Sequence, residues 1–190
     1  MMEKAEALQN LRKCVLTCAR CMLCFERTNA VPGEGSPDAK IFITGEAPGE
    51  EEDKQGVPFC GRSGQLLDKL FSVMGLKRDE LYIANVLKCR PPSNRTPEQR
   101  EVDHCLFFLE QQIAIVQPKV IMTLGATATK YLLQTDEAIS KLRGEWQEYN
   151  GVPLMPTFHP AYILRNNTDE IKKMWKSDFK AVIDRVSNVL

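Results

Sequence analysis

Ile41-Phe42-Ile43-Thr44-Gly45-Glu46-Ala47-Pro48-Gly49 is the stretch that decides the fold, because a short apolar run passes directly into a tight turn. Three more apolar runs, residues 81–86, 120–124 and 154–158, also end at polar or glycine-bearing turns. Stretches of helical character separate these runs. Such alternation predicts a three-layer α/β fold, in which a four-stranded parallel sheet carries helices on both faces.

Two helices can be placed from local signals. Thr96-Pro97-Glu98-Gln99 has the pattern of an N-cap, a first-position proline and a capping-box glutamine, so a helix is expected to begin there and to carry Cys105 inward. Near the C-terminus, apolar residues at helical spacing form one stripe that faces the core. They are Ile171, Met174, Trp175, Phe179, Val182, Ile183 and Val186.

Length and composition indicate an ordinary globular protein. The 190 residues are 43% hydrophobic and 26% charged, which predicts one domain over residues 1–190. Residues 1–13 have no apolar signal-peptide core, and no stretch approaches membrane-spanning length, so we expect a cytoplasmic monomer with no membrane partner. Because the formal net charge is zero, any basic surface for nucleic acid must be local.

Four of the seven cysteines predict a metal centre. Cys18 and Cys21 form a C-x-x-C pair. Cys89 and Cys105 follow later in the chain, with fifteen residues between them. Thiolates select zinc or iron-sulfur clusters. A zinc ribbon normally brings a second C-x-x-C, so the pattern favours an iron-sulfur cluster while zinc stays an alternative.

The other three cysteines allow a rival interpretation. Cys14, Cys18 and Cys21 have the spacing by which radical S-adenosylmethionine enzymes hold a cluster, but Arg20 replaces their usual aromatic residue and the chain is short for their barrel. A ferredoxin pattern fails at Thr28, where the next cysteine is missing. We expect Cys14, Cys24 and Cys60 to be small buried thiols.

The predicted strands all end at residues suited to ligand binding. The first runs into Gly45 and Gly49, whose backbone can approach a ligand closely, and then into the acidic run 50–53. The others end at Asn85, Gly125 and His159. Ligands of parallel sheets bind beyond the carboxyl ends of the strands, so these residues should meet at one edge. The acidic run alone is more typical of a solvated surface.

Three blocks in order resemble the signatures of family four uracil-DNA glycosylases. They are residues 45–56 with Pro58-Phe59, then Asn85-Val86-Leu87-Lys88-Cys89-Arg90-Pro91-Pro92, and then His159-Pro160-Ala161-Tyr162-Ile163-Leu164-Arg165. The resemblance implies a four-stranded parallel sheet between helices and uracil-containing DNA, single- or double-stranded, as the substrate. It also implies a 4Fe-4S cluster on Cys18, Cys21, Cys89 and Cys105. Val57 and Cys60, on either side of Phe59, depart from the family pattern, which commonly has arginine and valine there.

The resemblance also suggests individual roles. Phe59 would stack on a uracil flipped out of the DNA, and Ala47 stands where other members of the superfamily place a catalytic aspartate. His159 would donate a hydrogen bond to uracil O2 as charge develops there. The amide of Asn85 can donate to uracil O4 and accept from N3–H, a pattern opposite to that of cytosine. Glu46 and Glu52 are both candidates for holding water, and Glu52 could instead exclude the thymine methyl group.

DNA contacts are expected from residues near the same edge: Arg90, Arg95, Arg143, Leu164 and Arg165, with Leu164 as a wedge into the gap left by the base. Together these features predict a monofunctional uracil-DNA glycosylase. Two alternatives stay open: a radical S-adenosylmethionine enzyme that uses Cys14, and a non-catalytic iron-sulfur module that binds DNA.

Overall fold

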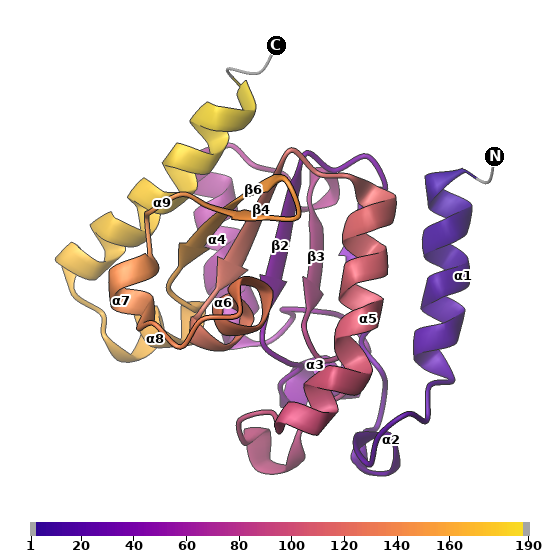
Figure 1. Cartoon of the computed structure of the whole chain (residues 1–190). Coiled ribbons are helices and arrows are strands. Elements are labelled where there is room, and N and C mark those ends of the chain that lie inside the picture. Colours follow the sequence, from indigo (N-terminus) through magenta and orange to yellow (C-terminus); the bar gives the residue numbers. More distant parts are fainter. Residues whose placement is uncertain (1–2, 188–190) are drawn as a thin grey trace.

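The four predicted apolar runs form parallel strands at the centre of a sheet. They are β2 (Ile41–Gly45), β3 (Tyr82–Asn85), β4 (Val120–Leu124) and β6 (Val152–Thr157). Strand β2 pairs with β3 and with β4, and β4 pairs with β6. The computed structural model, which describes residues 3–187, places helices on both faces of this sheet (Figure 1).

The sheet is larger than the sequence predicts. It has six strands in the order β1-β3-β2-β4-β6-β5, and the two edge strands are antiparallel to their neighbours. The prediction of a purely parallel, four-stranded sheet is therefore wrong. The edge strands β1 (Glu34–Gly35) and β5 (Gln147–Tyr149) are short and mostly polar, so they contain no apolar run from which a strand could be predicted.

Side chains of the central strands alternate between two hydrophobic cores. Phe42 packs into one core, whereas Ile41 and Ile43 pack into the other, as expected for a strand with period two. Ile121 and Met122 divide in the same way on the neighbouring strand. Because both faces are covered, the strands read as continuous apolar runs.

Different helices cover the two faces. Helices α1 (Lys4–Leu16), α5 (Gln99–Val116) and α6 (Ala126–Leu133) pack on one core (Figure 1). Helices α4 (Arg62–Met74), α8 (Pro160–Arg165) and α9 (Asp169–Ser187) pack on the other. The predicted C-terminal stripe lies on α9, where Trp175, Phe179 and Val182 are buried. Short elements complete the chain: α2 (Leu23–Glu26), α3 (Glu50–Gln55), η1 (Arg78–Glu80), η2 (Pro92–Asn94) and α7 (Ile139–Leu142).

The start of α5 differs from the prediction. The helix begins at Gln99 with Glu98 in the N-cap position, and a carboxylate oxygen of Glu101 accepts a hydrogen bond of 2.8 Å from the Glu98 N–H. Thr96 precedes a proline, which favours an extended backbone and keeps it outside the helix. Cys105 nevertheless points inward and is buried, as expected. None of the helices within residues 3–187 combines the length and apolarity needed to cross a membrane.

Candidate active site

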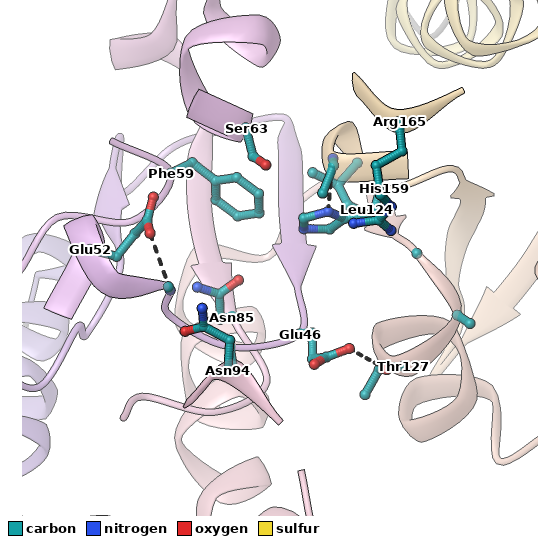
Figure 2. A pocket seen from close by; sticks show the side chains of 15 residues that line it. Glu46, Glu52, Phe59, Ser63, Asn85, Asn94, Leu124, Thr127, His159 and Arg165 are labelled. Atoms are coloured by element: carbon teal, nitrogen blue, oxygen red, sulfur yellow. Dashed lines mark hydrogen bonds between the residues drawn. The ribbon is translucent and has the colours of Figure 1, made fainter. Parts of the chain in front are cut away.

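A cleft with a volume of about 510 Å³ opens beyond the carboxyl ends of β2, β3, β4 and β6 (Figure 2). It includes eight of the residues predicted from sequence: Glu46, Ala47, Gly49, Glu52, Phe59, Asn85, His159 and Arg165. The parallel strands thus bring together residues separated by more than a hundred positions in the chain. Of the other predicted residues, Gly45, Arg90, Arg95, Arg143 and Leu164 do not line the cleft.

Asn85 is the last residue of β3 and lies at the base of the cleft. Its side chain is almost fully buried, yet Oδ1 has no hydrogen-bond partner among residues 3–187. A buried acceptor without a donor is costly, commonly by about 1–3 kcal/mol, so such an atom usually awaits a ligand or water. Asn85 is therefore poised to accept a hydrogen bond from a molecule in the cleft.

The ring of Phe59 forms one wall of the cleft. Its centroid lies 5.9 Å from that of the His159 ring, at an interplanar angle of 37°. The backbone of Phe59 has a φ of +50°, a conformation uncommon for residues other than glycine. Gly64 accommodates this turn, because a Cβ there would lie 1.6 Å from the Phe59 carbonyl oxygen. The fold thus fixes the position of a flat apolar surface.

Gly45 stands behind both of these side chains. A Cβ at this position would lie 2.6 Å from Asn85 Oδ1 and 2.6 Å from Cζ of Phe59. Gly45 itself does not line the cleft, but only glycine leaves room for the amide and the ring together. Glycine is thus needed here for the approach of two side chains, and the expected approach of the Gly45 backbone to a ligand stays a prediction.

His159 enters the cleft as the N-cap of α8. Its Nδ1 accepts a hydrogen bond of 3.1 Å from the Ala161 N–H. Burial of the ring, together with the charge of Arg165, lowers the pKa of His159 to about 4. The imidazole is therefore neutral near pH 7, with its proton on Nε2.

The two candidate carboxylates have different partners. Glu52 spans the turn: Oε2 accepts from the Gly49 N–H at 3.1 Å (Figure 2), and Oε1 accepts from the Gly61 N–H at 2.8 Å. Glu46 instead accepts a hydrogen bond from the Thr127 hydroxyl, and within the described part of the chain it does so through Oε2 only. Both oxygens of Glu52 are thus engaged with backbone, whereas Oε1 of Glu46 is left for other partners.

The acidic run is a helix rather than only a solvated surface. Residues 50–53 open α3, and Asp53 is buried with its carboxylate accepting from the N–H groups of Thr28 and Asn29. Asp53 thus fastens α3 to the segment that follows α2. Sequence reasoning missed this role, because a run of four acids gives no sign of which one turns inward.

Two of the arginines expected to contact DNA form ion pairs with buried acids. Arg95 binds Glu101 with both terminal nitrogens, at 2.9 and 2.6 Å, and Arg143 Nε donates to Asp178 at 3.0 Å. Arg90 lies nearer the cleft, where its Nε donates to Oδ1 of Asn94 at 2.7 Å. Their contacts with DNA stay predictions, as does the role of Leu164, which is 40% exposed.

The four cysteines predicted to bind metal line one cavity between α1, the loop after β3 and α5. The Sγ of Cys89 accepts from Arg27 Nη1 at 3.0 Å, and that of Cys105 accepts from the Lys88 N–H at 3.2 Å. None of the cysteines in residues 3–187 forms a disulfide. Burial raises the pKa of the Cys105 thiol to about 12.

These thiols fit a cluster by the chemistry of the donors. Four soft sulfur atoms surround one enclosed space, and N–H groups point at two of them, as they do around bound thiolates. Within residues 3–187, however, no three His, Cys, Asp or Glu side chains are arranged to hold a metal ion as they stand.

The remaining cysteines correct another expectation. Cys14 is exposed on α1 and Cys24 and Cys60 are partly exposed, so the prediction of buried thiols is wrong for all three. Helix α1 has only one buried residue, Val15, which leaves Cys14 facing solvent. Cys24 lines the same cavity as the four predicted ligands, whereas Cys14 does not.

Several residues of the cleft were not predicted. They are Ser63, Asn94, Leu124, Ala126, Thr127 and Ala161, together with Gly125, for which the sequence predicts only the end of a strand. The end of β4 was a usable signal for Leu124–Thr127, because all carboxyl ends of a parallel sheet lie at one edge. Ser63 lies in the first turn of α4 and Asn94 is the last residue of η2, so no strand pattern could locate either of them.

Fold and site together define an α/β protein whose cleft suits a flat ring with hydrogen-bonding edges. The comparisons with known proteins agree. Residues 32–182 match the model of the family described as "Uracil DNA glycosylase superfamily", and the chain belongs to this family.

Similar relatives carry the name Type-4 uracil-DNA glycosylase. That of Sulfurisphaera tokodaii is 43% identical over 186 residues, which cover 93% of this chain and 84% of that protein. That of Thermotoga maritima is 43% identical over 182 residues, or 95% of each chain. That of Saccharolobus solfataricus is 42% identical, covering 92% of this chain and 84% of that protein. The resemblance to family four is confirmed.

Proposed function

We propose that this protein is a Type-4 uracil-DNA glycosylase, which hydrolyses the N-glycosidic bond of uracil in DNA and leaves an abasic site. Family membership supports the activity, and one observation carries the assignment to this cleft. The unpaired Oδ1 of Asn85 lies beside the ring of Phe59, so a planar base that stacks on the ring can present an N–H to the amide.

Asn85 selects uracil by its hydrogen-bonding edge. Oδ1 accepts from uracil N3–H, and the amide nitrogen donates to O4. Cytosine has an acceptor at N3 and a donor at N4. Its N3 would therefore face the acceptor Oδ1, and its N4 amine would face the amide nitrogen, which is also a donor. A site that buries its own polar groups rejects such an analogue strongly, because those groups stay unpaired.

His159 stabilises the departing base. When the bond between the sugar C1′ and uracil N1 breaks, negative charge spreads onto the uracil ring and its O2. A neutral imidazole that donates from Nε2 can stabilise this charge without giving up its proton. Arg165, which also lines the cleft, adds positive charge close by.

Glu46 orients the attacking water. One carboxylate oxygen is held by Thr127 and the other accepts a proton from water as the water oxygen bonds to C1′ and the bond from C1′ to uracil N1 breaks, so that uracil leaves as an anion. Glu52 fixes the turn that carries Gly49 and Gly61, and so shapes the side of the cleft near Phe59. Arg90, Arg165 and the exposed Leu164 contact the DNA around the flipped nucleotide.

Cys18, Cys21, Cys89 and Cys105 hold a 4Fe-4S cluster in this proposal. Bound there, the cluster supplies a cross-link between the N-terminal segment, the loop after β3 and α5. Hydrolysis of a glycosidic bond transfers no electrons, so the catalytic steps fall to the residues of the cleft.

The deciding experiment is cleavage of an end-labelled oligonucleotide that contains one uracil, followed by alkali. The protein should yield one fragment from single- or double-stranded substrate, and none from an otherwise identical oligonucleotide with thymine. His159→Ala should slow release at least roughly a hundredfold while DNA affinity changes far less. If folded protein binds the DNA but releases no uracil, the chain is a non-catalytic DNA-binding module.

A further inference from the structure

Lys88 is a buried lysine without a carboxylate partner. It is only 1% exposed, and its Nζ donates to the backbone oxygen of Asn85 at 2.6 Å and to Oε1 of Gln112 at 2.7 Å. No ion pair among residues 3–187 includes it. Burying an ammonium group costs several kcal/mol, and an apolar side chain of similar length would fill the space more cheaply. Stability alone thus gives no reason for a lysine here.

Gln112 fixes the other end of this contact. Its Nε2 donates to the Pro32 oxygen at 2.6 Å and to the Tyr82 hydroxyl at 3.2 Å, so its Oε1 must face Lys88. The side chain of Gln112 is itself buried on α5. The ammonium of Lys88 is therefore held by a side chain of α5. Through its second hydrogen bond, to the Asn85 oxygen, it fixes the position of the Asn85 backbone.

The backbone that Lys88 holds is the end of β3. Past Asn85 the chain stays bound to the neighbouring segment, since the Val86 N–H donates to the Gly45 oxygen at 2.9 Å and the Leu87 N–H to the Glu46 oxygen at 3.0 Å. It then turns, and the side chain of Lys88 folds back to Asn85. The same residue touches the cysteine cavity, because its N–H donates to the Cys105 Sγ.

We propose that Lys88 is a positioning residue for base recognition, which holds the backbone of Asn85 so that the side-chain amide meets the edge of the base. This inference rests on the proposed function of the cleft. Without the ammonium, the Asn85 carbonyl loses its buried donor, the strand end relaxes, and the amide no longer keeps one orientation. Lys88 also connects the base-reading residue to the segment that carries Cys89.

The test is Lys88→Met, which keeps the length of the side chain and removes the ammonium. A hydrogen bond to a charged group contributes about 1.5–3 kcal/mol, so single-turnover uracil release should slow roughly 10- to 100-fold. Tyr82→Phe is the matched control, because it removes a bond at the far end of the same network and should leave the release rate within about twofold.

A double-mutant cycle shows whether Lys88 acts through Asn85. If it does, Lys88→Met combined with Asn85→Ala should be no slower than Asn85→Ala alone, within about twofold. Multiplied effects of the two changes, or a wild-type rate for Lys88→Met, would overturn the proposal. If Lys88→Met does not fold, Gln112→Met removes the anchor of the ammonium, and the same cycle with Asn85→Ala decides.

Hydrogen exchange separates this inference from the proposed function. The Val86 and Leu87 amides should exchange at least roughly tenfold faster in Lys88→Met than in wild type, and no faster in Tyr82→Phe. Unchanged exchange in Lys88→Met contradicts the proposed role of Lys88. A wild-type protein that releases no uracil contradicts the proposed function, whatever the exchange rates show.

Discussion

The backbone N–H of Ala161 donates to Nδ1 of His159 at 3.1 Å, and this bond determines which nitrogen of the ring carries the proton. With Nδ1 acting as an acceptor, the neutral ring holds its hydrogen on Nε2. Burial and the charge of Arg165 keep the ring neutral by lowering its pKa to about 4. His159 is thus a donor that does not depend on protonation near pH 7.

The pH dependence of uracil release follows from this. Between pH 5.5 and 8.5 the neutral ring is fully populated, so titration of His159 should leave the single-turnover rate unchanged across that range. A rate that falls as pH rises through 6 to 7 would mean that an imidazolium is required. Circular dichroism at each pH controls for unfolding.

The free energy of unfolding, in contrast, should depend on pH at acidic values. The pKa of His159 is lowered to about 4 on folding, so between pH 4 and 6.5 the unfolded chain binds more protons at this residue. Stability from this group is complete above pH 6.5 and falls on acidification. Between pH 7 and 5 the wild type should lose about 1–2 kcal/mol more than His159→Gln in urea unfolding. Equal losses would contradict a buried neutral ring.

Asn85→Asp should change the base preference. The carboxylate can accept from the exocyclic amine of cytosine, whereas it meets uracil O4 with an acceptor. A good bidentate pair contributes about 1–3 kcal/mol of discrimination, and the substitution breaks the pair between Asn85 and uracil. The ratio of uracil release to cytosine release should therefore fall by roughly one or more powers of ten. Single-turnover assays on matched oligonucleotides measure both. Asn150→Asp, in an exposed turn, is the control, and an unchanged preference in Asn85→Asp would show that Asn85 does not read the base.

Replacing the two glutamates should have separate effects. Glu52→Gln puts an amide group against one of two backbone N–H donors, so it should lower the free energy of unfolding by about 1–3 kcal/mol. Glu46→Gln keeps a partner for the Thr127 hydroxyl and should leave stability unchanged while slowing uracil release. Thermal unfolding and single-turnover kinetics of both variants are the measurements. Fast uracil release by a stable Glu46→Gln protein would show that another residue orients the attacking water.

The cysteines make a prediction about iron. Anaerobically purified protein should be brown with about four irons per chain, and Cys89→Ala should lose both colour and thermal stability. Cys14→Ala is the control, because that thiol is exposed and lies outside the cavity. Stoichiometric zinc without iron would exclude the cluster, and bleaching by Cys14→Ala would favour the radical-enzyme interpretation.

Much of the fold could be predicted because burial leaves a pattern in sequence. The central strands lie between two cores, so each is a continuous apolar run, and parallel pairing brings Asn85 and His159 to one edge. Strands β1 and β5 pack little apolar surface, and sequence gives no sign of them. Helix α5 begins at Gln99 because Glu101 accepts a hydrogen bond from the Glu98 N–H, and the capping pattern at Thr96 predicts a different start.

The site could be predicted less completely, because the partner of a charged side chain is a tertiary property. Arg95 and Arg143 look the same in sequence as arginines free to meet phosphates, but each is paired with a buried acid. Likewise, Glu46 and Glu52 cannot be distinguished by spacing. The geometry that separates them is the pair of backbone N–H groups around Glu52, which come from a turn and from the start of α4.

The absence of a side chain at Gly45 limits how this protein could evolve toward another base. The amide of Asn85 and the ring of Phe59 share the space that a single methyl group would fill, so a change in either one shifts the wall against which the other rests. Any variant that keeps both the amide and the ring in place must therefore retain glycine at position 45, whatever base it prefers.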